Sequence, residues 1–161
     1  MGNEGYHSPV IMETKELLQR NLLFKGCTRD DFELLSGLFQ ERKVQPGLTI
    51  FTEKMPAEAL YIIKAGKVRI SLMAGEGEEI GLLLLGPGDF FGEIALIQES
   101  SRAVTARAED AVEVLMMTRK DFQALIDLEP RVAAKLTLAI ARLLAMRVKA
   151  YGNKLRDILL S

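Results

Sequence analysis

Residues 41–117 form a series of short apolar runs in which hydrophobic side chains recur at every second position, with glycine or proline between the runs. A period of two predicts β-strands, and many short strands separated by turns are typical of an antiparallel sandwich or barrel. The clearest alternation is in residues 67–72. We expect Val68, Ile70 and Leu72 on one face of that strand and Lys67, Arg69 and Ser71 on the other.

Residues 80–85 are the densest apolar run of the chain and are hydrophobic on both faces. This pattern predicts a buried strand that something besides its own sheet must cover. Residues 48–51, 59–63 and 112–117 are the other expected strands. Gly75 and Gly77 are assigned to a hairpin tip, because a dinucleotide-binding fingerprint would need a helix after the glycines.

Two helices are expected in residues 9–40. The first opens at Pro9, and its apolar face consists of Leu17, Leu18, Leu22 and Leu23. The second follows Thr28, which has the spacing of a capping box with Asp31. Residues 118–161 should again be helical, because Thr118 and Asp121 repeat the capping-box spacing and Pro130 restarts a helix that can run almost to Leu160.

The last helix carries two apolar stripes, which indicates two packing partners. The first stripe is expected to pack on the β-strands, and the second has the alternating spacing of four and three that is typical of a coiled-coil seam. The first contains Val132, Leu136, Ile140 and Leu143, and the second contains Leu144, Val148, Tyr151, Leu155 and Ile158. The second stripe favours a homodimer through this helix. The alternative is one long helix folded back over its own domain, and Gly152 is a point where the helix can bend or end.

The composition favours a single domain that spans residues 1–161 and excludes several classes of function. The formal net charge is −1, so there is no basic field for broad contact with nucleic acid or a membrane surface. No apolar run has membrane-spanning length and the N-terminus lacks a signal segment, which predicts a cytoplasmic protein.

The chain has one histidine, His7, and one cysteine, Cys27. The sequence therefore does not support a metal-binding cupin site, a Ser-His-Asp catalytic set or a Cys-His catalytic set. We expect no catalytic residue, no metal and no cofactor.

The chemistry-bearing stretch is residues 86–105. Gly92 permits a close approach of a ligand to the backbone, and a helical turn after Glu93 would offer free amides to an anion. Arg102 can meet two phosphate oxygens with its planar fork. The alternative is that Glu93 and Arg102 merely form an ion pair that closes a hairpin loop.

Gly92-Glu93-Ile94-Ala95-Leu96, a five-residue gap and Arg102-Ala103-Val104-Thr105 resemble the phosphate-binding cassette of cyclic nucleotide-binding domains, as in catabolite activators and cyclic AMP-dependent kinase regulatory subunits. The resemblance implies a mainly β fold, an antiparallel β-roll of jelly-roll type flanked by N-terminal helices and a long C-terminal helix. It also implies that Glu93 binds the ribose 2′-hydroxyl, that Arg102 binds an equatorial phosphate oxygen, and that the amides of Ile94, Ala95 and Ala103 complete the cradle. Ser101 departs from the proline that is common in the family.

The resemblance extends to base recognition through the last helix. Catabolite activators place hydroxyl side chains there against the adenine, whereas this chain has Arg147 and Val148 at the corresponding positions. Arg147 either stacks on the purine or is an ordinary solvated arginine. Ala103 points to cyclic AMP, because members selective for cyclic GMP usually have threonine directly after the arginine.

We therefore expect a regulatory sensor, not an enzyme, that binds cyclic AMP and moves its C-terminal helix. One alternative is a fragment or relative of a catabolite-activator-type transcription regulator. The chain stops at Ser161, where the DNA-binding helix-turn-helix of that class would begin, so we expect no direct nucleic-acid contact. The other alternative is a ligand-free dimerisation module.

Overall fold

The computed structural model describes residues 13–160, so the expected helix start at Pro9 lies outside the described residues. The first part of the chain contains helix α1 (Thr14–Arg20), the 3-10 helix η1 (Leu22–Phe24) and helix α2 (Arg29–Leu38). The predicted capping box of α2 is present in both directions between Thr28 and Asp31. The prediction that Leu22 belongs to the buried face was wrong. Asn21 ends α1 and caps η1, which turns Leu23 inward and leaves Leu22 76% exposed.

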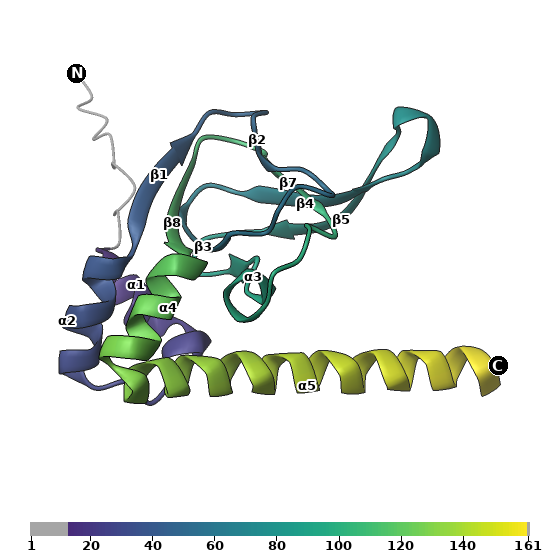
Figure 1. Ribbon diagram of the computed structural model, residues 1–161. Helices are drawn as coiled ribbons and strands as arrows, with labels where there is room; N and C mark the ends of the chain where they lie inside the picture. Colours follow the sequence, from purple (N-terminus) through teal and green to yellow (C-terminus); the bar gives the residue numbers. More distant parts are fainter. Residues whose placement is uncertain (1–12, 161) are drawn as a thin grey trace, which may run out of the picture.

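Within the described residues the strands form two antiparallel sheets of four strands, as expected for a β-roll (Figure 1). One sheet has the order β1-β8-β3-β6 and the other β2-β7-β4-β5. The strands of the first are β1 (Gln40–Val44), β8 (Val112–Thr118), β3 (Ala59–Ala65) and β6 (Phe90–Phe91). Those of the second are β2 (Thr49–Phe51), β7 (Thr105–Ala108), β4 (Val68–Met73) and β5 (Glu79–Leu85). The turn η2 (Gly75–Gly77) joins β4 to β5, which agrees with the expected hairpin tip.

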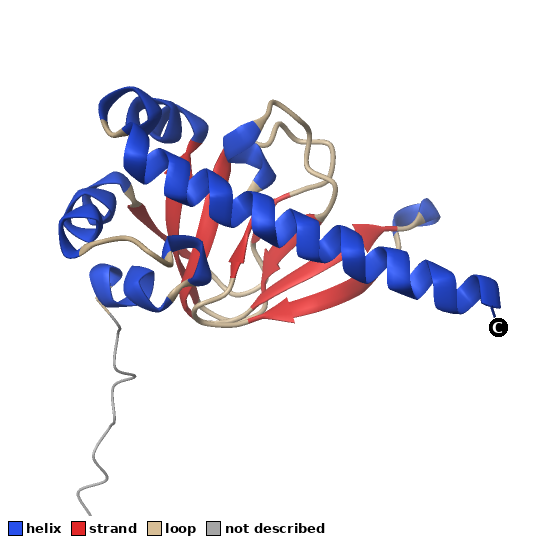
Figure 2. Cartoon of the chain, turned by 90° about the horizontal axis from the view of Figure 1, so that it is seen from below, coloured by secondary structure: helices blue, strands red, loops and turns tan. Residues whose placement is uncertain are grey.

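The hydrophobic core has two parts, which meet at the central strand β3. Leu60 and Ile62 of β3 pack with the helices, while Tyr61 and Ile63 point between the two sheets. Alternate side chains of one strand thus serve both parts, as the pleat of a strand requires. The first sheet therefore packs against the second sheet with one face and against the helices with the other. Figure 2 shows the helices gathered beside the strands.

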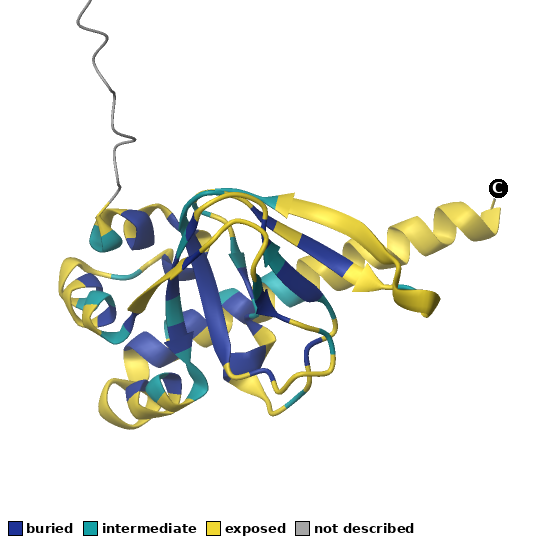
Figure 3. Ribbon diagram, turned by 90° about the horizontal axis from the view of Figure 1, so that it is seen from above, coloured by how far each residue is buried: buried dark blue, intermediate teal, exposed yellow. Residues whose placement is uncertain are grey.

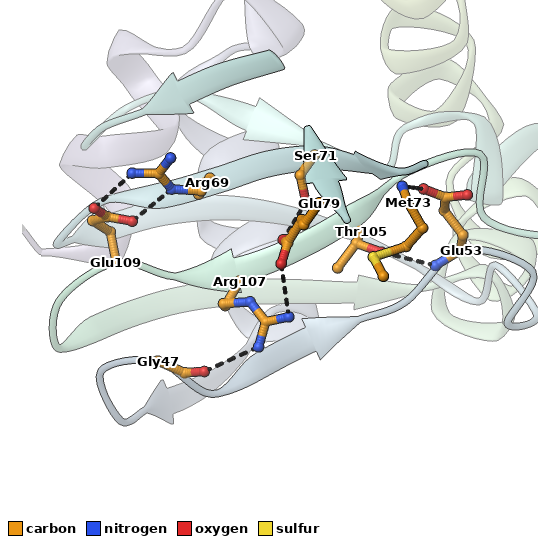
Figure 4. Close-up of polar contacts among 9 residues, drawn as sticks. All are labelled: Gly47, Glu53, Arg69, Ser71, Met73, Glu79, Thr105, Arg107 and Glu109. Carbon is orange, nitrogen blue, oxygen red and sulfur yellow. Dashed lines mark hydrogen bonds and ion pairs between the residues drawn. The ribbon is translucent and has the colours of Figure 1, made fainter. Parts of the chain in front are cut away.

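The outer face of the second sheet is covered by polar contacts, which Figure 4 shows. Arg69 forms two hydrogen bonds of 2.8 Å with the carboxylate of Glu109. Ser71 donates to Glu79, which also accepts from Arg107 at 3.2 Å. These hydrogen bonds from Ser71 and Arg107 lower the pKa of Glu79.

This polar layer bears on the two faces expected for residues 67–72. Ser71 lies on the face of Arg69, as expected, and it is fully buried because its hydroxyl lies under Glu79. Leu72 shares a face with Val68 and Ile70 in the expected alternation, but it is 38% exposed. Alternation predicted Val68 and Ile70 correctly, but it could not show that the strand extends past the core at Leu72.

Strand β5 is exposed, which contradicts the prediction that residues 80–85 form a buried strand. It lies at the edge of its sheet and pairs only with β4 among the described strands. Leu83 is 60% exposed, and Ile80 and Leu84 are each 53% exposed (Figure 3). The apolar composition was read correctly, but nothing in the described residues 13–160 covers these side chains.

Two helices complete the chain, α4 (Arg119–Leu128) and α5 (Pro130–Leu160). The capping box of Thr118 and Asp121 at the start of α4 is present as predicted. Helix α5 continues through Gly152 and runs beneath the β-roll in the view of Figure 1. Among residues 13–160, no helix combines the length and the hydrophobicity needed to span a bilayer.

The two stripes of α5 are only partly as predicted. Val132, Leu136 and Ile140 are buried against the helices and the first sheet, as expected of the first stripe. The next core contact comes from Leu144, which was assigned to the second stripe, and not from Leu143. The rest of the second stripe is exposed, although α5 crosses the β-roll and its Tyr151 lines a pocket there (Figures 1 and 2).

Candidate functional site

A pocket of about 360 Å³ lies between the β-roll and α5, at the helical turn α3 (Ile94–Ile97). Most of the predicted site residues meet there. Gly92, Glu93, Ile94, Ala95, Arg102, Val104 and Arg147 all line this pocket. Ala103 does not line it and its side chain is exposed. The structure thus gathers residues from the cassette and from a helix more than forty positions later in the chain.

Gly92 is required by its surroundings. Its φ of +80° lies in the left-handed region, which favours glycine. A Cβ atom at this position would lie 2.7 Å from Nη1 of Arg102 and 2.8 Å from the carbonyl oxygen of Ala59. The glycine therefore lets the chain turn into α3 while the guanidinium of Arg102 packs directly against it.

The turn α3 is held in place by Arg119, the first residue of α4. The Arg119 guanidinium donates to the carbonyl oxygens of Ala57 at 3.0 Å, Ala95 at 3.2 Å and Gln98 at 3.4 Å. At the start of the turn, the Ala95 amide donates to the Gly92 carbonyl at 3.2 Å. Sequence reasoning placed Arg119 only within a capping box, because nothing in its spacing relates it to residues 57–98.

Arg102 is a buried cation at the base of the pocket. Only 8% of the residue is exposed, and its Nη2 donates to the Ala59 carbonyl at 2.8 Å. Its Cζ lies 4.0 Å from the centre of the Phe51 ring, within the range of a cation–π contact. In the described part of the chain, its Nε is the one buried side-chain nitrogen or oxygen atom that has no hydrogen-bond partner. Burial lowers the pKa of Arg102, because it disfavours the charged form.

Glu93 is 4% exposed, and its carboxylate pairs with the guanidinium of Arg147 from α5. Within residues 13–160 no ion pair joins Glu93 to Arg102. The alternative that Glu93 and Arg102 form an ion pair that closes the loop therefore does not agree with the structure. Arg147 was considered as a stacking or solvated residue, and its pairing with Glu93 was not foreseen.

Sequence reasoning missed the aromatic support of the site. Tyr61 and Phe91 stack with ring centres 5.1 Å apart, and each ring centre lies 5.8 Å from that of Phe51. These rings come from three strands, so only the sheet pairing brings them together. Their proximity had no signal in the local sequence pattern.

The model of the cyclic nucleotide-binding domain family matches residues 41–129, which is more than half of the chain. The chain belongs to this family. The family assignment from the cassette is thereby confirmed, and the β-roll agrees with it. Two residues that line the pocket, Arg147 and Tyr151, lie beyond the matched range.

Individual members of the cyclic nucleotide-binding domain family are similar to this chain in sequence and structure. The cyclic AMP receptor protein of Thermus thermophilus is 38% identical over 120 residues, which cover 74% of this chain and 56% of that protein. The crystal structure of the N-terminal domain of a transcriptional regulator from Streptomyces coelicolor A3(2) has a TM-score of 0.75 at 30% identity, covering 83% of this chain and 96% of that one. The regulatory domain of Toxoplasma gondii PKA, crystallised with cAMP, has a TM-score of 0.64 at 29% identity, covering 70% and 42%.

The chain spans between half and two thirds of the length of the curated relatives it matches first. In the described residues, no group of three or more histidine, cysteine, aspartate or glutamate side chains could hold a metal ion.

Replacement of Gly92 by alanine tests the packing of the cassette turn. Gly92→Ala should lower the free energy of unfolding by about 1–3 kcal/mol, because the left-handed backbone strains a non-glycine residue and the new Cβ displaces Arg102. Urea denaturation measures the change. Gly37→Ala is the control, since a Cβ atom added at Gly37 in α2 would meet no atom within 4 Å and should be neutral or stabilising. Equal stability of Gly92→Ala and the wild type would contradict the tight packing.

Proposed function

We propose that the pocket binds cyclic AMP and that Arg102 binds its phosphate. The observation that carries this proposal is the buried guanidinium of Arg102, which has an unpartnered Nε and no carboxylate in an ion pair within the described residues. A buried cation without a counter-ion is costly unless an anion pairs with it. The exocyclic phosphate oxygens of a cyclic nucleotide carry a negative charge and match the arginine fork.

Glu93 supports the binding of the ribose in the same pocket. Its carboxylate is buried at the start of α3, and one oxygen already accepts from Arg147. The other oxygen is then the acceptor for the 2′-hydroxyl. The amides of Ile94, Ala95 and Ala103 would bind the phosphate, and the Ala95 amide must exchange its bond to Gly92 for a phosphate oxygen. Val104 forms part of the apolar wall of the pocket.

The choice of cyclic AMP over cyclic GMP rests on the apolar wall of the pocket and on the family resemblance at Ala103, whose side chain does not line the pocket. Ala103 has no hydroxyl to meet the amino group of guanine. Leu82, Leu83 and Tyr151 contribute apolar surface to the pocket from β5 and α5. An apolar wall of this kind accepts the face of a purine and offers no partner to additional polar groups.

We further propose that ligand binding shifts the position of α5, so that the domain acts as a sensor and not as an enzyme. Two arginines support this coupling. Arg119 joins the first turn of α4 to the Ala95 carbonyl of α3, and Arg147 joins α5 to Glu93. A ligand that rearranges α3 would therefore bias both helices, to the extent that it binds the two arrangements with different affinity.

A homodimer through α5 is supported by the exposed seam. Val148, Tyr151 and Leu155 are between 57% and 70% exposed and repeat at steps of three and four. The apolar edge strand β5 lies on the same side as this part of α5, since both line the pocket. A second copy of the chain would remove both surfaces from water.

Calorimetric titration of nucleotide-stripped protein with cyclic AMP, cyclic GMP and linear AMP tests the function. Arg102→Ala should weaken cyclic AMP binding by about 2–5 kcal/mol, since the phosphate charge would stay unpaired in a partly dry pocket. Arg69→Ala is the control, because Arg69 lies on the outer sheet face with Glu109 and should leave the affinity unchanged. No heat with any nucleotide at two temperatures would favour the ligand-free dimerisation module.

The role of Arg147 can be separated from that of Arg102 by comparing cyclic AMP with 2′-deoxy cyclic AMP. Arg147→Gln should weaken binding of cyclic AMP about tenfold, or about 1.4 kcal/mol, because the Glu93 carboxylate is no longer held toward the 2′-hydroxyl. It should weaken binding of the deoxy ligand much less. Arg156→Gln on the exposed end of α5 is the matched control. An equal loss for both ligands would show that Arg147 does not act through the ribose.

The dimer can be tested on a seam residue that does not line the pocket. Leu155→Glu places a charge in the predicted interface and should convert a dimer to a monomer in sedimentation velocity measurements. Leu128→Glu at the end of α4 is the control, because Leu128 is 78% exposed and lies off the seam. A wild-type monomer at all accessible concentrations would refute the homodimer.

A further inference from the structure

A second, larger concavity lies on another face of α5, with a volume of about 530 Å³. Its floor is formed by Leu23, Phe90 and Leu143, which are buried or half-buried. Its walls are the side chains of Leu22, Leu138 and Met146, which are 76%, 50% and 69% exposed. This size lies within the range of sites for small molecules, which are typically about 300–1,000 Å³.

Neither the nucleotide nor the proposed second copy of the chain covers this concavity. Met146 is two residues from both Leu144 and Val148, so it lies about 200° around the helix from the seam. Arg142 likewise lies two residues before Leu144. The concavity therefore faces away from the coiled-coil partner and stays accessible in the dimer.

The charges at the rim are all positive. Lys25, Lys135 and Arg142 border the concavity, and none of the described residues that line it is acidic. Lys135 is held by Asp31 at 2.8 Å, which lowers the pKa of that carboxyl. Within residues 13–160, neither Lys25 nor Arg142 forms an ion pair. Since the whole chain has a net charge of −1, this local excess is not a consequence of a basic protein.

We propose that this concavity binds a single-chain carboxylate amphiphile such as a medium-chain fatty acid. The hydrocarbon chain would lie on Leu23, Phe90 and Leu143, where burial removes apolar surface from water. The carboxylate would lie between Lys25 and Arg142 and supply the counter-charge that neither cation has within residues 13–160. A concave floor with a cationic rim suits one amphiphile at a time, whereas a membrane surface would need a flat or protruding apolar face.

Titration of the full chain with dodecanoate below its critical micelle concentration tests the proposal. We expect saturable binding of one molecule per chain, with NMR shift changes at Leu138 and Met146. Dodecyltrimethylammonium has the same tail with the opposite charge and should not saturate the site. Arg142→Gln should weaken dodecanoate binding at least about fivefold, and Arg156→Gln should not change it.

Met146→Asp supplies a second test that does not depend on the core, because its side chain is 69% exposed. It should abolish dodecanoate binding without loss of the folded state in circular dichroism. Equal binding of the two amphiphiles, equal effects of Arg142→Gln and Arg156→Gln, or binding only to anionic vesicles would each overturn the proposal.

Discussion

The arrangement of this domain depends on one buried cation, the guanidinium of Arg102. It is held by the Ala59 carbonyl from β3 and by the ring of Phe51 from β2, so it touches both sheets at once. Because a buried guanidinium cannot easily lose its proton, the fold must supply polar contacts or accept an anion there. Gly92 packs against the same guanidinium, and any larger residue at this position would occupy the space of Arg102.

The features predicted correctly from the sequence are those that depend on residues close together in the chain. The capping boxes of Thr28 and Thr118 depend on four consecutive residues, and both are present. The cassette from Gly92 to Val104 is likewise local, which is why the sequence was enough to assign its side chains to one pocket, apart from Ala103. Alternation within β4 predicted the burial of Val68 and Ile70 for the same reason.

The errors concern features that depend on distant parts of the chain or on another molecule. An apolar run predicts that residues 80–85 seek burial, but it does not say whether the cover belongs to the same chain, and here β5 is an exposed edge. The prediction for Leu22 was wrong because Asn21 ends the first helix and caps η1. The helical period therefore no longer determines where Leu22 points. The partners of Arg119 and Arg147 lie more than twenty and fifty positions away, so no spacing could have indicated them.

The same two arginines connect the pocket to the C-terminal helices, although the second half of α5 has little packed surface against the β-roll. The second half of α5 is almost entirely exposed, so its position is not fixed by apolar packing in the described chain. Arg147 joins this half of the helix to the β-roll, and its partner is the buried carboxylate of Glu93, which lines the pocket. A ligand that competes for this charged contact would therefore act directly on the helix. The weakness of the packing is therefore what would make the position of α5 sensitive to a ligand.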